Sequence, residues 1–152
     1  PVGAYAFDSF LTNYQLGPQR PVNGWLGFIR GSFFGGTRTQ GRFNGRVELS
    51  PRFSVEPRIA IDWVDLPQGS FVSRLVSGLV TYTMTPRSFV AALVQYNSGT
   101  ESMATNIRFR WEYEPGSDLF VVYTEGRDTI ERGFPGLQDR GFVVKLTRLF
   151  RF

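Results

Sequence analysis

Residues 140–152 read RGFVVKLTRLFRF, and this stretch decides the fold. One set of alternate positions holds Phe142, Val144, Leu146, Arg148, Phe150 and Phe152, while the residues between them include Lys145, Thr147 and Arg151. A period of two is typical of a β-strand whose two faces meet different surroundings. The stretch is therefore predicted to be a strand, and we interpret it as the closing strand of a β-barrel.

The composition fits a single domain made of many short strands and tight turns. The chain has 152 residues, of which 16% are aromatic and 17 are glycine. No segment resembles the ~18 consecutive apolar residues of a membrane helix, although barrel strands give a much weaker signal. The chain begins at Pro1 rather than at Met, so we expect a processed chain or part of a longer one. We treat residues 1–152 as one β-barrel domain, with residues 1–20 as an extra strand or a lead-in outside the barrel.

Several functional classes are excluded or disfavoured by residue usage. The chain has no cysteine and no histidine, which removes thiolate nucleophiles, Ser-His-Asp hydrolases and the usual zinc sites. The net charge is +4, and Lys145 is the one basic residue that is not arginine. The arginines are dispersed and follow no nucleic-acid-binding motif, so nucleic acid is not a predicted partner. No cofactor is predicted.

Alternation and turn residues divide the chain into about eight or nine antiparallel strands. A tight reversal is predicted at Gly35-Gly36, a polar loop at residues 98–103 and a long charged loop at residues 126–139. Pro57 cannot donate to a ladder, so a bulge or an unpaired position is expected there. The predicted strands cover residues 4–15, 24–34, 37–49, 53–63, 70–84, 89–97, 104–113, 119–125 and 140–152.

One face of the predicted strands is polar. If residues 50–52 close a tight hairpin, Arg46 lies opposite Glu56, Asn44 approaches Arg58 and Gln40 approaches Asp62. We interpret this face as a structural ion-pair network that fills the barrel interior; the alternative is an arginine-lined path for an anion or an acidic sugar. The predicted network consists of Arg42, Arg46, Glu48, Glu56, Arg58, Asp62, Arg108, Arg110 and Glu112.

The other face is apolar, and its aromatic residues are sorted by depth. Phe109 is an exception to a central band that is otherwise mainly aliphatic. Two aromatic girdles around an aliphatic band suit a bilayer, because amphipathic rings favour its interfaces. The predicted girdles are Phe53, Tyr82, Trp111, Tyr113, Phe150 and Phe152 at one end, and Trp63, Tyr96, Tyr123 and Phe142 at the other.

Loop and strand lengths favour a transmembrane barrel over a soluble one. Short connections at residues 50–52, 85–88 and 114–117 share one end, and the long predicted loop lies at the other. Most predicted strands reach the ~9–11 residues that cross a bilayer. The fold prediction is an all-β, antiparallel up-and-down transmembrane barrel, closed by eight strands or part of a larger barrel. The alternative is a soluble β-barrel or sandwich that binds a ligand or a protein partner.

Five stretches together resemble a known family. The similarity is clear from about residue 66 onward, and it is carried by residues 86–89 (PRSF), 92–97 (ALVQYN), 106–113 (NIRFRWEY), 115–123 (PGSDLFVVY) and 144–150 (VKLTRLF). They resemble the C-terminal barrel of an uncharacterised bacterial outer-membrane family that pairs it with a module similar to family 9 carbohydrate-binding modules. The ending LFRF also looks like the signal read by the barrel assembly machinery, with Arg148 departing from the usual apolar alternation. The resemblance implies a fragment of a larger protein, and no sugar-binding residue carries over.

The predicted role is a non-enzymatic outer-membrane barrel with a structural, anchoring or transport-associated function. Its predicted partners are outer-membrane lipid, the assembly machinery at the C-terminal strand and other envelope proteins. A third hypothesis is an outer-membrane hydrolase using paired carboxylates, either Asp62 with Asp65 or Glu125 with Asp128. These fit no motif, and a calcium site from Glu101, Asp128 and Glu131 matches no known spacing, so no metal site is predicted.

Overall fold

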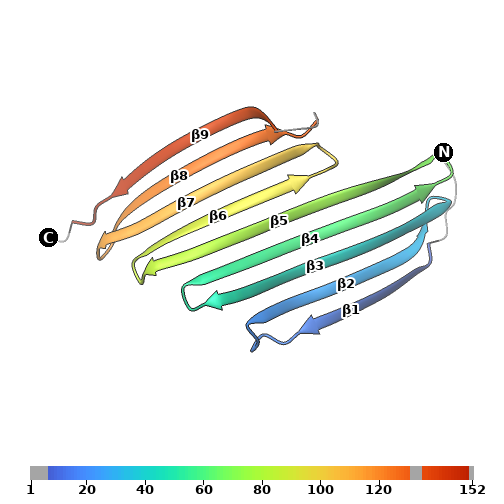
Figure 1. Cartoon of the computed structure of the whole chain (residues 1–152), viewed down its shortest axis with the longest axis horizontal. Coiled ribbons are helices and arrows are strands. Elements are labelled where there is room, and N and C mark those ends of the chain that lie inside the picture. Colours follow the sequence, from blue (N-terminus) through green and yellow to red (C-terminus); the bar gives the residue numbers. More distant parts are fainter. Residues whose placement is uncertain (1–6, 131–134, 151–152) are drawn as a thin grey trace.

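The computed structural model describes residues 7–130 and 135–150 and contains one nine-stranded antiparallel sheet (Figure 1). The all-β, up-and-down architecture that the sequence predicts is confirmed. The strands are β1 (Ser9–Leu16), β2 (Val22–Phe33), β3 (Gly36–Ser50), β4 (Phe53–Leu66), β5 (Gly69–Thr85), β6 (Ser88–Asn97), β7 (Ser102–Glu114), β8 (Ser117–Asp128) and β9 (Gly136–Thr147).

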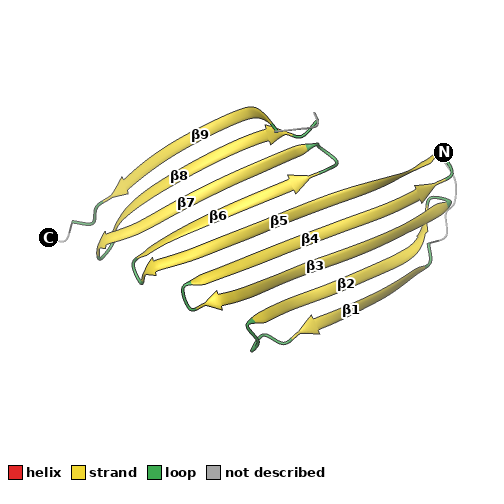
Figure 2. Cartoon of the chain, viewed as in Figure 1, coloured by secondary structure: helices red, strands yellow, loops and turns green. Residues whose placement is uncertain are grey.

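Each strand pairs with its neighbours in sequence, in the order β1 to β9, and the sheet is not closed. Every hairpin is displaced along the strand direction relative to the previous one, so the ends of the strands form oblique edges (Figure 1). Figure 2 shows that strands and short turns make up the described chain. Among these described residues there is no helix long and apolar enough to cross a bilayer.

Three hairpins at one end share a turn design. In β3–β4, β5–β6 and β7–β8 the pairing register shifts just before the turn, which sets Leu49, Met84 and Tyr113 outside the regular pairing. The turns carry prolines at positions 51, 86 and 115, and proline fixes the backbone angle that a tight turn needs. We call this end the proline-turn end. The predicted short connections at this end are confirmed.

The reversal between β2 and β3 lies one residue earlier than predicted. Phe34 and Gly35 form the turn with φ of 46° and 82°, and Gly36 already belongs to β3. Two successive residues in the left-handed region are what a two-residue hairpin with the right-handed twist of a sheet requires. The polar loop predicted at residues 98–103 is likewise shorter, since β7 begins at Ser102.

Pro57 interrupts the pairing of β4 with β3, as expected from its missing N–H group. The β3–β4 register runs from Asn44 opposite Arg58 to Val47 opposite Val55, with no Cα partner assigned to Pro57 on this side. On its other side β4 pairs continuously with β5, where Pro57 lies opposite Gly78. The strand therefore continues through the proline.

The long charged loop predicted at residues 126–139 is wrong. Strand β8 runs to Asp128 and β9 starts at Gly136, so residues 126–128 and 136–139, half of that segment, are strand. Two charged residues that flank the predicted loop lie opposite each other, Glu125 on β8 and Arg140 on β9, and within the predicted loop Gly126 lies opposite Asp139. Cross-strand pairs of opposite charge stabilise a sheet, and they extend this hairpin beyond its apolar part.

The closing strand ends earlier than predicted. Strand β9 stops at Thr147, and the amide of Leu149 donates to Ser117 Oγ at 3.1 Å instead of joining the ladder. The expected alternation holds within β9, where Phe142, Val144 and Leu146 lie opposite Tyr123, Val121 and Leu119. Phe150 is outside the strand, with Arg148 over its ring at 5.1 Å. Phe152 lies outside the described residues, as do residues 4–6 of the first predicted strand.

The molecule is a single layer with little enclosed interior. Among the described residues, Val64, at 5% exposure, is the buried hydrophobic side chain. Many large apolar residues are exposed instead, including Phe142 and Leu146 at 67% each. Apolar surface on this scale marks an interaction surface. The sheet therefore stabilises itself mainly through its ladders and cross-strand pairs.

Candidate functional site

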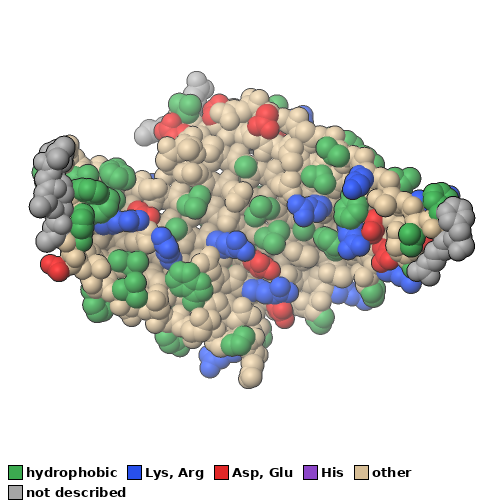
Figure 3. All heavy atoms as spheres, turned by 180° about the vertical axis from the view of Figure 1, so that it is seen from behind, with side chains coloured by type: hydrophobic (Ala, Val, Ile, Leu, Met, Phe, Trp, Pro, Cys, Tyr) green, Lys and Arg blue, Asp and Glu red, His purple; other side chains and the backbone are tan. Residues whose placement is uncertain are grey.

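The two faces of the sheet differ in chemistry. Residues that pair across strands share a face, so the registers define a polar face and an apolar face. Figure 3, which views the sheet from the side opposite to Figure 1, shows Lys and Arg side chains in a broken band with Asp and Glu among them. The polar face carries Arg38, Gln40, Arg42, Asn44, Arg46, Glu48, Glu56, Arg58, Asp62, Arg108, Arg110 and Glu112.

The centre of one cluster on the polar face is Asp62 on β4. Its Oδ1 accepts hydrogen bonds from Arg38 Nε at 2.7 Å and Gln40 Nε2 at 2.5 Å. Gln40 is only 3% exposed, whereas the Arg38 side chain remains 40% exposed. The predicted approach of Gln40 to Asp62 is therefore present, but the charge partner of Asp62 is Arg38, which is not among the predicted network residues.

A second cluster lies nearer the proline-turn end, where Arg46 bridges two carboxylates. Its Nε donates to Glu48 Oε1 at 3.0 Å and its Nη1 donates to Glu56 Oε1 at 3.2 Å. The predicted meeting of Arg46 and Glu56 is present, and Asn44 lies opposite Arg58 as expected. No hydrogen bond or ion pair joins the Arg42 or Arg58 side chains to this cluster within the described residues.

Strands β7 and β8 hold a third, separate cluster. Arg110 donates to Asp118 through two bonds, Nε to Oδ1 at 3.0 Å and Nη2 to Oδ2 at 3.3 Å. Its guanidinium also lies 5.5 Å from the centre of the Phe120 ring. Glu112 accepts from the amide of Gly116 at 3.0 Å. The polar face is therefore a set of local clusters rather than one continuous network. Asp118 was not among the predicted network residues, but the register of the hairpin that turns at residues 115–116 could have identified it as a partner on this face.

The carboxylate pairs considered for hydrolysis are not pairs in space. Asp62 lies on the polar face and Asp65 on the apolar face, and Glu125 and Asp128 are divided in the same way. Their separation of three residues explains this, because side chains of a strand alternate between faces. The described residues contain no group of three acidic side chains placed to hold a metal ion. Glu131, part of the calcium hypothesis, lies outside those residues.

A charged cluster on the apolar face escaped the sequence analysis. Glu125 accepts hydrogen bonds from the Tyr123 hydroxyl and from Arg127 Nε, and Arg140 Nη2 donates to it at 3.3 Å. Arg127 Nη1 also donates to the Pro135 carbonyl at 2.9 Å. Glu125 lies two residues beyond Tyr123 on β8, toward the end opposite the proline turns. Arg127 and Pro135 fall in the loop predicted at residues 126–139, and this hid the cluster.

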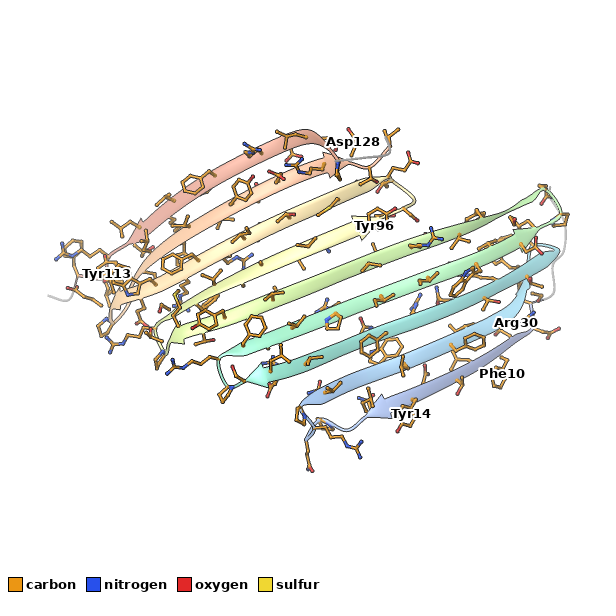
Figure 4. All side chains as sticks on the ribbon, viewed as in Figure 1. Phe10, Tyr14, Arg30, Tyr96, Tyr113 and Asp128 are labelled. Atoms are coloured by element: carbon orange, nitrogen blue, oxygen red, sulfur yellow. The ribbon has the colours of Figure 1, made fainter. Side chains whose placement is uncertain are left out.

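Aromatic side chains lie toward both ends of the apolar face. At the proline-turn end Phe53 lies opposite Tyr82 with ring centres 6.5 Å apart, and Trp111 is 6.1 Å from Tyr113. Trp63 and Tyr96 lie toward the other end, and Tyr96 is labelled in Figure 4. Tyr123 and Phe142, predicted for the same end, lie opposite each other near the middle of β8 and β9. Phe109, the exception to the predicted sorting, shares a hydrogen-bonded row with Tyr82 through Val90.

No family model, curated protein or solved structure matches this chain.

Proposed function

We propose that this sheet is part of the wall of a transmembrane β-barrel in a bacterial outer membrane, with a membrane-anchoring or transport-associated role and no catalysis. The polar face would line the interior and the apolar face would contact lipid. The observation that carries this proposal is the depth sorting of the apolar face. On β4, for example, the aliphatic residues Val55, Ile59 and Ile61 of this face lie between Phe53 at the proline-turn end and Trp63 toward the other end.

Charge on the apolar face supports the same orientation. Apart from Glu114 beside the bulge of β7, the charged strand residues of this face lie toward the end opposite the proline turns. A soluble core has no reason to collect charge at one end, whereas a bilayer excludes it from the hydrocarbon region. The residues are Arg30, Asp65, Arg74, Glu125, Arg127 and Arg140.

Strand length and displacement also support a membrane wall. Eight of the strands have 10 to 17 residues, and β1 has 8. A tilted strand needs ~9–11 residues to cross a bilayer. The stepped hairpins of Figure 1 are what tilted strands of a barrel require.

The number of strands determines how such a barrel could close. In a nine-stranded meander β1 and β9 run in the same direction, so they cannot pair antiparallel with each other. Single-chain bacterial barrels contain an even number of strands. We therefore propose that an odd number of further strands completes the barrel. The resemblance to the C-terminal barrel of an outer-membrane family belongs to this proposal, as does recognition of the C-terminal strand by the assembly machinery.

The ion-pair clusters of the polar face are assigned a structural role. Arg38, Arg46 and Arg110 each contact a carboxylate, which compensates charge on an interior surface. Arg42, Arg58 and Arg108 contact no carboxylate within the described residues. The alternative role for the polar face is a path along which an anion would contact these three guanidiniums.

A second candidate function is a sheet that binds another protein layer. It is favoured by apolar side chains on the polar face of β5 to β9, such as Leu75, Phe120 and Val143. A hollow of about 380 Å³ lies there, lined by Arg108, Phe120, Val122, Val143 and Lys145. In a barrel this patch would contact a plug or another envelope protein; in a soluble protein it would contact a second sheet.

Membrane fractionation separates the two candidates. The protein is produced with an export signal, and membranes are washed with alkaline carbonate, which removes peripheral proteins. The proposal expects the chain to remain in the membranes and to float with lipid vesicles after purification. A chain that is released by carbonate and stays monomeric in buffer without detergent would contradict the membrane proposal and support the soluble one.

A further inference from the structure

The apolar face has a hollow where β2, β3 and β4 meet. Its volume is about 360 Å³, and its lining is almost entirely apolar. Gly41 on β3 lies between Phe28 on β2 and Ile61 on β4 in one hydrogen-bonded row, so a row of large side chains has a gap at its centre. The walls are formed by Tyr14, Leu26, Phe28, Phe43, Ile61 and Trp63.

Close packing does not require glycine at position 41, because the space above it is open. A Cβ atom added to Gly41 would lie 3.7 Å from Trp63 Cζ3, which is an ordinary van der Waals contact, and no backbone atom is closer. Gly41 is also not among the glycines with positive φ. The backbone therefore tolerates a side chain at this position, and the missing one leaves room for part of another molecule.

Two arginines flank the hollow on the same face. Arg74 lies directly opposite Ile61, and Arg30 lies opposite Thr39, two residues from Phe28 along β2. Figure 4 shows Arg30 beside Phe10, its partner on the neighbouring strand, with Tyr14 farther along that strand. Both arginines are exposed.

Neither guanidinium has a partner among the residues that the structure describes. No hydrogen bond or ion pair joins the Arg30 or Arg74 side chain to any residue in the described ranges, whereas Arg127 and Arg140 on the same face contact Glu125. Positive charge next to lipid needs an anion, and a guanidinium matches a phosphate with two parallel hydrogen bonds.

We propose that the Gly41 hollow and the two flanking arginines bind a membrane lipid with an anionic phosphate headgroup. One acyl chain would occupy the hollow over Gly41, and the phosphate would contact Arg30 or Arg74 toward the end of the sheet opposite the proline turns. The inference rests on the proposed function, because it requires the apolar face to contact lipid.

Trp63 provides a direct readout, since it lines the hollow and is 46% exposed. The chain has three tryptophans, so Trp25→Phe together with Trp111→Phe leaves Trp63 as the single fluorophore. This variant is reconstituted in phosphatidylcholine vesicles that contain increasing fractions of phosphatidylglycerol or phosphatidylcholine with brominated acyl chains. Bromine quenches tryptophan only at close contact, so the titration gives the relative association of each lipid at the hollow.

The expected result is about fivefold stronger association of the brominated anionic lipid, because a basic residue near an anionic surface contributes on the order of a factor of five. Arg30→Gln with Arg74→Gln should bring the ratio to about one. Gly41→Leu should reduce quenching by both lipids. A matched control, Arg58→Gln with Arg108→Gln, removes the same charge from the polar face and should leave the ratio unchanged.

The possible outcomes distinguish failure of the lipid site from failure of the proposed membrane barrel. If both lipids quench Trp63 equally, and neither double arginine substitution changes their ratio, the lipid site is wrong. That result would not contradict the proposal that the sheet is part of a membrane barrel. Absence of quenching by either lipid would show that Trp63 does not face the bilayer, and would overturn the proposed function together with the site.

Discussion

Gln40 on β3 donates a hydrogen bond from Nε2 to Oδ1 of Asp62 on β4 over 2.5 Å, and the same oxygen accepts from Arg38. Gln40 is 3% exposed, so this amide has no access to water as an alternative partner. The stability of the β3–β4 hairpin therefore depends on a carboxylate that serves a buried donor and a half-exposed cation together.

Asp62→Ala should destabilise the protein by about 1–3 kcal/mol, because it leaves the buried Gln40 amide without an acceptor. The measurement is the urea dependence of unfolding in a lipid or detergent environment. Glu48→Ala is the matched control, since Glu48 is 52% exposed and its bond to Arg46 should contribute less than about 1 kcal/mol. Equal losses in the two variants would show that burial of Gln40 has no energetic consequence.

Arg110→Lys should lower stability by about 1 kcal/mol although it keeps the charge, since lysine cannot make the two parallel bonds to Asp118. The stacking of the guanidinium on Phe120 is lost as well. Unfolding of Arg108→Lys gives the comparison, because Arg108 contacts no carboxylate within the described residues. An Arg110→Lys protein as stable as the Arg108→Lys protein would argue against the bidentate contact.

Gly35→Ala should cost about 1–2 kcal/mol, because a residue with a Cβ atom is strained at the φ of 82° found there. Gly41→Ala tests the same chemical change where φ is ordinary and the added methyl group meets only a 3.7 Å contact. The Gly41→Ala protein should retain its stability in the same unfolding experiment. If both variants lose the same stability, the turn at Phe34 and Gly35 is not the one described.

Ser117→Ala should free the C-terminal segment after β9. Ser117 is 1% exposed, and its Oγ accepts the amide of Leu149 at 3.1 Å. The Leu149 amide should therefore exchange with deuterium faster in the variant, while amides within the β7–β8 ladder keep their protection. If the exchange rate of the Leu149 amide is the same in the variant, the hydrogen bond to Ser117 does not hold this segment away from the β-ladder.

The β3–β4 hairpin could be predicted from sequence almost completely. Its alternation is regular, a proline turn fixes the register, and the meetings of Gln40 with Asp62 and of Arg46 with Glu56 follow from counting residues outward from the turn. The same counting also separates Asp62 from Asp65, so the failure of the acid-pair hypothesis was already contained in the sequence.

The β8–β9 hairpin was predicted less well for a physical reason. A run of charged residues is usually solvated loop, and only the three-dimensional pairing of Glu125 with Arg127 and Arg140 shows that strand continues there. The hollow at Gly41 was beyond sequence analysis, since it depends on the registers of three strands at once. An odd number of strands also means that β1 and β9 cannot pair antiparallel with each other. The sequence did not settle this number, because the first segment could not be assigned as a strand with certainty.

The central claim, that one face of the sheet contacts lipid and the other water, can be tested on four consecutive residues of β4. The chain has no cysteine, so single cysteines at Arg58, Ile59, Ala60 and Ile61 can each carry a spin label without further changes. In lipid vesicles the account predicts that labels at 59 and 61 are relaxed mainly by lipid-soluble oxygen, and labels at 58 and 60 mainly by a water-soluble reagent. Equal access of the water-soluble reagent to all four positions would contradict it.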